Sequence, residues 1–329
     1  MERTSSVFVL SLSPLSLISF LLLLLPATSS AAAATITIPQ QLFKDPNIKY
    51  HNGPLLTGDI NLSILWYGGK VPETFVTFIK SLKDDGSITF DPKVSDWWKT
   101  VESYQSTANK NQSRRPPSIN VNIVSKIEDP IFSLGHEFTK FDETIPDLVR
   151  KATNGNPDGS SIAVIVIGEG VNLPCGRRED EEKCYEHGII GNNQIYIVIK
   201  NLLRHCGWVC AWPFHKQPEM FQDGVNLVVD PPTWDYETHL NIIHFASALV
   251  STVTNPYGNG FYAEGKPIVE IGDCCSKAFG TGYFPGFTGR VHVDPHNGGT
   301  FNAHGVNDTR FMVPGLWNPK HSSTCWTAL

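Results

Sequence analysis

The sequence contains little charge and no long run of basic residues. Charged residues make up 18% of the 329 residues, with 32 acidic against 26 basic side chains. No run of five or more Lys or Arg is present, so the chain offers no phosphate-binding stripe, and we do not expect nucleic acid as a partner. An apolar content of 41% is enough for a sizeable core and excludes a disordered chain. The 27 Gly and 23 Pro indicate many turns and argue against a long helical bundle.

Several motifs of catalysis and cofactor binding are also missing. The chain has no G-x-S-x-G and no P-loop, and Gly280-Thr281-Gly282 with Gly286 is one residue out of step with a dinucleotide fingerprint. His136-Glu137 begins like a zinc-protease motif, but the fifth residue is Lys140, whose ammonium would repel a metal. We therefore interpret residues 136–140 as a solvated polar segment and expect no cofactor.

One long apolar stretch is present, at the N-terminus. Residues 7–25 are apolar and residues 27–34 are small, which is typical of a secretory signal peptide; an uncut signal anchor is the alternative. We assign residues 1–31 to the signal peptide, 32–49 to a linker and 50–329 to one domain, with cleavage between residues 29 and 33. The mature protein is then expected to be secreted and extracellular, with no membrane partner.

In an oxidising compartment the seven cysteines are expected to pair. Cys206 and Cys210 bracket three residues and predict a small disulfide loop, and Cys175 with Cys184 would close a charged excursion. Cys325 is left to join one of two adjacent thiols, Cys274 or Cys275, and the other stays free.

Three sequons predict N-glycosylation: Asn61, Asn111 and Asn307. Asn111 lies in a polar loop and is the strongest of the three. Asn61 lies in a predicted strand with core-like neighbours, so we expect that site to be empty or partly used.

The hydrophobic pattern predicts a mixed α/β fold in which helices cover a mixed sheet. Strands are expected at residues 60–67, 119–124, 162–167, 194–199, 268–271 and 289–293. Helices are expected at residues 72–82, 94–104, 145–152 and 236–253. The last helix is apolar nearly all round, which predicts that it is buried.

Two further groups of residues are candidates for chemistry. The densest set of metal-ligand types is His292, Asp294, His296 and His304, although Pro295 interrupts the strand and surface histidines are the alternative. The eight tryptophans could form a sugar-stacking platform, but most are expected in the core. Trp208 is the best candidate for an exposed ring.

Several short motifs, in order, resemble the plant EXORDIUM-like, phosphate-induced protein family. The resemblance covers residues 50–325 and is carried by YHNGP (50–54), LTG (56–58), WYG (66–68), VSDWWKTV (94–101), CGWVCAWPF (206–214), TNP (254–256), VEIGD (269–273), GTG (280–282) and TG (288–289). The family is secreted to the apoplast and cell wall and is associated with growth and brassinosteroid responses. The resemblance also implies that Cys275 pairs with Cys325 and leaves Cys274 free.

The sequence departs from the family at one motif. Where the family carries His-Glu-Ile-Ala-Glu on a helix, this chain has Ser247-Ala248-Leu249-Val250-Ser251. Such a motif would hold a metal with its first and fifth side chains and use the second as a base. The carboxylates that could complete that site remain here as Glu270 and Asp273. His244 cannot substitute, because it lies three residues from position 247.

The resemblance and this departure together predict a zincin-like fold with a degenerate metal site. We therefore expect a protein without catalytic residues or cofactors that acts by binding, with a cell-wall polysaccharide or an extracellular protein as partner. Two alternatives stay open: a metal-dependent hydrolase or peptidase with a displaced site built from Glu270, Asp273 and the histidines at 292, 296 and 304, and a carbohydrate-binding protein.

Overall fold

A computed structural model describes residues 47–108, 117–174, 183–191, 193–201, 210–215, 227–265, 267–318 and 325–329. All of them belong to one compact unit, Leu42–Leu329. The expected signal peptide, most of the expected linker, and Asn111, Cys175, Cys206 and Trp208 lie outside the described residues. Within the described residues, no helix is both long and apolar enough to cross a membrane.

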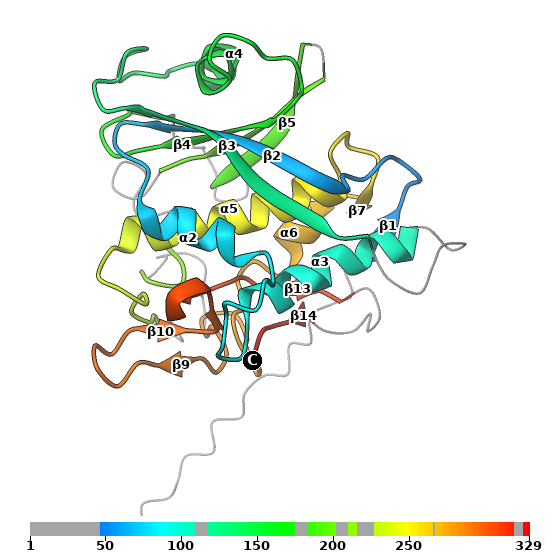
Figure 1. The fold of residues 1–329 in the computed structure, drawn as a ribbon, viewed down its shortest axis with the longest axis vertical. Coiled ribbons are helices and arrows are strands. Elements are labelled where there is room, and N and C mark those ends of the chain that lie inside the picture. Colours follow the sequence, from blue (N-terminus) through cyan, green and yellow to red (C-terminus); the bar gives the residue numbers. More distant parts are fainter. Residues whose placement is uncertain are drawn as a thin grey trace, which may run out of the picture. The chain divides into compact units, whose positions relative to one another are not determined.

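A five-stranded mixed sheet forms the centre of the fold (Figure 1). Its strands lie in the order β3-β2-β4-β6-β5. They span Ile119–Asp129 (β3), Gly58–Tyr67 (β2), Ile162–Ile167 (β4), Gln194–Ile199 (β6) and Tyr185–Ile190 (β5). Neighbouring strands are parallel except for the edge strand β5, which is antiparallel to β6.

The side chains of each central strand alternate between two apolar clusters, as the pleat requires. On β2, Leu62 and Ile64 belong to one cluster, while Leu65 and Tyr67 belong to the other. Strand β4 is buried on both faces along its whole length, which explains its continuous apolar sequence. Both faces of the sheet must therefore be covered by other elements.

Helix α4 (Phe141–Ala152) covers one face, and α2 (Glu73–Ser81), α3 (Val94–Ala108) and α5 (Tyr236–Thr254) lie on the other (Figure 1). The buried residues of α2 and α3 follow helical spacing, and Trp97 and Trp98 are both fully buried. Their indole N–H groups donate to the carbonyls of Pro314 (2.7 Å) and Ile119 (2.9 Å), which satisfies two polar atoms inside the core.

Helix α5 is buried on nearly every side, as its composition predicts. Phe245, Leu249 and Val253 pack into the cluster beneath the sheet, whereas Leu240 and Ile243 pack into a separate cluster with Phe279 and Met312. The helix therefore lies between the sheet and the C-terminal part of the chain. Asp235 caps its first turn by accepting the backbone N–H of Thr238 at 3.1 Å.

The remaining strands are short and form small separate pairings. They are β1 (Lys49–Tyr50), β7 (Phe261–Ala263), β8 (Val269–Glu270), β9 (His292–Val293), β10 (Thr300–Phe301), β11 (Ala303–His304), β12 (Arg310–Phe311), β13 (Leu316–Trp317) and β14 (Cys325–Trp326). A four-residue helix, α6 (Ile271–Cys274), directly follows β8, and the 3₁₀ turn η3 spans Val306–Asp308.

The mixed α/β prediction is confirmed, with helices on both faces of a mixed sheet. Two strands are shorter than predicted: β8 ends at Glu270, where α6 begins, and β9 contains only His292 and Val293. The sequence analysis missed β5, which is the strand nearest to the site described next.

Candidate functional site

A polar cluster is buried where α5, α6 and β5 meet, at the positions of the expected metal motif. Ser247 and Ser251 lie one turn apart on α5 and are 1% and 0% exposed. Helix α6 lies directly on this turn: a Cβ at Gly272 would be 2.1 Å from the carbonyl oxygen of Ser247 and 2.6 Å from the hydroxyl of Ser251. Glycine is therefore required at position 272, and little room is left above the two serines.

Glu270 is 7% exposed, and other protein groups already occupy its carboxylate. One oxygen contacts Nε2 of His187 at 2.8 Å, and the other accepts the side-chain amide of Asn255 at 2.5 Å. Although burial raises the pKa of Glu270, the contacts with His187 and Asn255 outweigh it and hold that pKa below its ordinary value. Glu270 is thus an ionised carboxylate whose two oxygens are both bonded to other side chains.

Asp273 is held differently. Its carboxylate accepts the phenol of Tyr185 and the backbone N–H of Glu270. Burial, together with the neighbouring charge of Glu270, raises the pKa of Asp273 in spite of the bond from Tyr185. The two carboxylates therefore differ in pKa, although Glu270 caps the short helix α6 that contains Asp273.

Strand β5 supplies the partners of both carboxylates. Tyr185 and His187 alternate along the strand and pair with Ile199 and Ile197 of β6, whose side chains belong to the cluster beneath the sheet. Residues 185 and 187 therefore face α5 and α6.

These residues do not fit a catalytic metal. Zinc sites in enzymes use about three imidazole, thiolate or carboxylate ligands, but positions 247 and 251 offer neutral hydroxyls and Ala248 has no proton-accepting group. Glu270 and Asp273 are the only carboxylates that remain of the implied set, and both are bonded to protein donors. His187, Asn255 and Tyr185 compensate the buried carboxylates, whereas the Ser247 and Ser251 hydroxyls and Nδ1 of His187 have no hydrogen-bond partner among the described residues. One imidazole nitrogen beside two neutral hydroxyls does not make a zinc ligand set.

A second group of metal-ligand types lies beside the cluster but is also occupied. Cys184, Cys210 and His244 have ligand atoms within 4.8 Å of one another, and no other such group is found among the described residues. The two sulfurs form a disulfide, so neither is a thiolate. Burial lowers the pKa of His244 to about 4, and its Nε2 lies 2.8 Å from the carbonyl oxygen of Cys210.

The histidines of the C-terminal third do not assemble with Glu270 and Asp273 in the described structure. His296 contacts Asp294 at 3.0 Å, and His304 contacts Asp308 at 2.7 Å. Arg310 also contacts the Asp294 carboxylate, which places a cation where a metal would have to bind.

Residues 136–140 match the predicted solvated segment only in part, because Phe138 is buried in the apolar cluster beside α4. His136 and Glu137 are exposed and lie before α4, not on a helix. The Lys140 ammonium pairs with Glu143 at 2.8 Å on the surface.

The disulfide pattern agrees with one expectation and corrects two others. Cys275 is bonded to Cys325, and Cys274 is a free thiol, as the resemblance implies. Cys184, however, is bonded to Cys210, so the predicted pairs Cys175–Cys184 and Cys206–Cys210 are wrong. The error came from pairing each cysteine with its nearest neighbour in sequence, whereas the fold brings the start of β5 to the segment that follows β6.

The described sequons differ in accessibility. Asn61 is half-buried within β2 and is paired across the sheet with Asn122. Asn307 is exposed in the turn η3 with a φ of 57°. Glycan attachment at Asn61, Asn111 and Asn307 stays a prediction.

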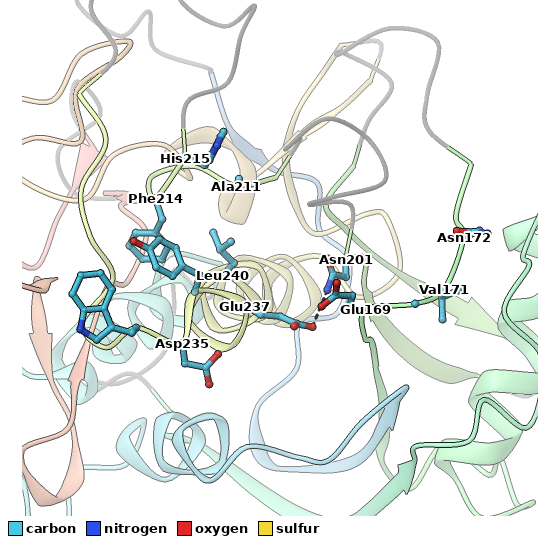
Figure 2. A pocket seen from close by; sticks show the side chains of 13 residues that line it. Glu169, Val171, Asn172, Asn201, Ala211, Phe214, His215, Asp235, Glu237 and Leu240 are labelled. Carbon is cyan, nitrogen blue, oxygen red and sulfur yellow. Dashed lines mark hydrogen bonds between the residues drawn. The ribbon is translucent and has the colours of Figure 1, made fainter.

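A much larger cavity opens at the other end of α5 (Figure 2). Its volume is about 850 Å³, against about 200 and 350 Å³ for the two cavities that border the buried cluster. The loop after β4, Asn201 shortly after β6, three residues of the segment 211–215 and the first turn of α5 line it. Trp234, at its edge, is 70% exposed, whereas the sequence analysis had favoured Trp208.

The sequence analysis missed Tyr185, His187 and Asn255, and the signal for the first two was weak. Residues 185–190 and 194–199 flank Gly191-Asn192-Asn193, a turn sequence that indicates a hairpin. That signal would have predicted β5, but not that His187 reaches a residue 83 positions away.

Comparisons with known proteins agree with the resemblance noted in the sequence. Residues 48–328 match the family model described as the phosphate-induced protein 1 conserved region. The chain is 34% identical to protein EXORDIUM-like 2 of Arabidopsis thaliana over 315 residues, covering 92% of this chain and 94% of the relative. It is 33% identical to protein EXORDIUM of the same plant (86% and 91% covered) and 32% identical to protein PHOSPHATE-INDUCED 1 of Nicotiana tabacum (85% and 88%). No solved structure matches the chain. The chain therefore belongs to the EXORDIUM-like, phosphate-induced protein family.

Proposed function

We propose that this protein is a secreted, non-enzymatic member of its family that acts in the apoplast or cell wall by binding. Its partner would be a wall polysaccharide or an extracellular protein, and its role would lie in growth and the brassinosteroid response. One observation carries the non-enzymatic part: the surviving carboxylate Glu270 is bonded to His187 and Asn255, beside hydroxyls at positions 247 and 251.

The zincin-like architecture belongs to the same proposal. Helix α5 lies under the sheet beside the antiparallel edge strand β5, and Glu270 follows it in the chain. Such a scaffold brings helix side chains and a later carboxylate to one point, as a metal site would require. In this chain the corresponding position holds the buried polar cluster, whose carboxylates are bonded to other side chains.

Two observations support secretion. The N-terminal segment has the composition of a signal peptide, and the described residues contain two disulfides, Cys184–Cys210 and Cys275–Cys325. Disulfides persist mainly in oxidising compartments. The mature chain should begin between Ser30 and Ala34, and intact mass measurement of secreted protein, before and after glycosidase treatment, tests this together with the glycans. A secreted chain that retains Met1 would contradict it.

Elemental analysis of the purified mature protein tests the loss of the metal site. We expect less than about 0.1 equivalent of zinc after dialysis against a mild chelator, because two engaged carboxylates without a free imidazole form no tight site. The matched comparison is the double variant Ser247→His/Ser251→Glu, which supplies an imidazole and a carboxylate one turn apart. Because both serines are tightly packed, circular dichroism must first show that the variant folds, and the folded variant should retain more zinc. Stoichiometric zinc in the unmodified protein would overturn the proposal and favour a hydrolase with a displaced site.

A further inference from the structure

The cavity at the amino end of α5 has the size and shape of a small-molecule site. At about 850 Å³ it falls in the range of ligand pockets in proteins, which are roughly 300–1,000 Å³. It lies where β4 and β6 end, and the carboxyl ends of parallel strands are a common location for ligand sites. The buried polar cluster contributes no residue to it.

One side of the cavity is apolar and aromatic. The Phe214 ring is buried and meets the Tyr236 ring edge-on at 6.2 Å, with Leu240 beneath them in the same apolar cluster. Trp234 lines the same cavity but is 70% exposed. A large apolar ring left in water at the mouth of a cavity is a surface that a ligand would cover.

The other side is polar. Figure 2 shows the side chains of Glu169, Glu237 and Asn201 converging on one point, with Phe214 on the other side of Leu240. The Asn201 amide donates to Glu237 at 2.8 Å. Burial and the nearby charge of Glu169 raise the pKa of Glu237 above its ordinary value. The polar side of the cavity thus presents the Asn201 amide and carboxylate oxygens where the protein partly excludes water.

The carboxylates of the described lining residues disfavour one class of ligand. The carboxylates of Glu169, Asp235 and Glu237 line the cavity, and no Lys or Arg is among its described lining residues. An anionic ligand such as a uronic acid would be repelled. A neutral saccharide fits both sides, because its C–H faces stack on aromatic rings and its hydroxyl groups both donate to carboxylates and accept from an amide.

We infer that this cavity binds a neutral saccharide, with the sugar stacked on Trp234 and its hydroxyl groups bonded near Glu237 and Asn201. The inference gives the proposed binding function a ligand class. It rests on that function for one point only, namely that the sugar comes from the cell wall. The same chemistry would recognise a free sugar or the end of a wall polysaccharide, and the experiment separates the two.

The test uses the purified mature glycoprotein and isothermal titration calorimetry. The probes are neutral oligosaccharides of glucose, xylose, galactose and mannose, the corresponding monosaccharides, and tetragalacturonate as the anionic counterpart. At least one neutral probe should bind, and tetragalacturonate should bind at least about tenfold more weakly. The variant Trp234→Ala should lose about tenfold or more in affinity, while Trp234→Phe should keep most of it. The exposed ring of Phe90, 54% exposed and outside the cavity lining, provides the matched control Phe90→Ala, which should bind unchanged.

A further variant separates a sugar from a cation. Glu237→Gln keeps a hydrogen-bonding oxygen but removes the charge, so affinity for a neutral sugar should change by less than about fivefold, whereas a cationic ligand would lose far more. The inference is overturned if no neutral probe binds at about 10 mM, or if Trp234→Ala binds as well as the unmodified protein.

Pull-down with isolated cell-wall material distinguishes this failure from failure of the proposed function. Wall binding that survives Trp234→Ala would refute the cavity and leave the proposed function standing. Saccharide binding in calorimetry without wall binding would support the cavity, identify a free sugar as its source, and count against the wall as the partner.

Discussion

The two ends of helix α5 differ in how open they are to solvent. Near the carboxyl end, Glu270 is bonded to protein donors and the neighbouring cavities are small. At the amino end, Trp234 is exposed beside a cavity of about 850 Å³. One buried helix therefore supports a closed polar cluster at one end, in which the Ser247 and Ser251 hydroxyls have no hydrogen-bond partner within the described part of the chain, and an open surface at the other.

The largest effect is expected from restoring a charge at the closed end. Ala248 is fully buried in the apolar cluster beneath the sheet. Ala248→Glu would place a carboxylate there without a partner, so we expect a loss of at least about 3 kcal/mol in the free energy of unfolding, or failure to fold. Urea denaturation measures the change, and Ala248→Ser, which adds one hydroxyl, should cost about 1 kcal/mol. Equal stability of the glutamate variant would show that position 248 faces a cleft.

The second effect concerns the link between the two ends. The Cys184–Cys210 disulfide joins the residue before β5 to the residue before the cavity wall at Ala211. Replacing both cysteines by serine should cost about 2–4 kcal/mol, because the bond closes a loop with a sequence separation of 26. Thermal unfolding measures this loss. A peptide map of the unmodified protein must first recover the Cys184–Cys210 link, and recovery of a Cys206–Cys210 link instead would contradict the structure.

The third effect tests the contact between His187 and Glu270. His187→Ala should cost about 3 kcal/mol, because it leaves a buried carboxylate with one partner fewer. In a double-mutant cycle with Glu270→Gln, the coupling energy should be about 1–3 kcal/mol. Urea denaturation of the four proteins at pH 7 gives this value. Additive losses would mean that the two residues do not stabilise each other.

Sequence patterns were sufficient for α5 and for the parallel strands β2, β3, β4 and β6 of the central sheet, but not for its edge strand β5. Strand β4 and helix α5 are long, apolar segments whose burial is enforced by composition, so period and length identified them. Strand β5 was missed because Glu186, His187 and Gly188 interrupt its apolar pattern, and an edge strand needs less burial. Pairings between distant segments, such as Cys184 with Cys210, depend on tertiary contacts that local spacing does not encode.

The serines were identified from the sequence because they stand where a family motif was expected. Their surroundings were not, because the partners of Glu270 come from β5 and from Asn255 at the end of α5. The cavity was missed for a similar reason. It is formed by loops after β4 and β6 that meet the first turn of α5, and Trp234 in one of them has no periodic pattern around it.

The smallest effect compares the two ends directly, through the pH dependence of stability. Because the pKa of Glu270 is held below its ordinary value of 4.5, its contribution is present above pH 4.5 and is lost as the pH falls through the folded-state pKa. The pKa of Glu237 is raised instead, so its contribution is present below pH 4.5 and is lost as the pH rises through the folded-state pKa.

Glu270→Gln should therefore lower stability at pH 7 and flatten its decline below pH 4.5. Glu237→Gln should leave stability at pH 7 unchanged or raise it by less than about 1 kcal/mol, because it removes a desolvated charge near Glu169. Urea denaturation of both variants and the unmodified protein between pH 3 and 7 measures how the change in the free energy of unfolding caused by each substitution varies with pH. If the two changes vary with pH in the same direction, Glu270 and Glu237 do not have oppositely shifted pKa values.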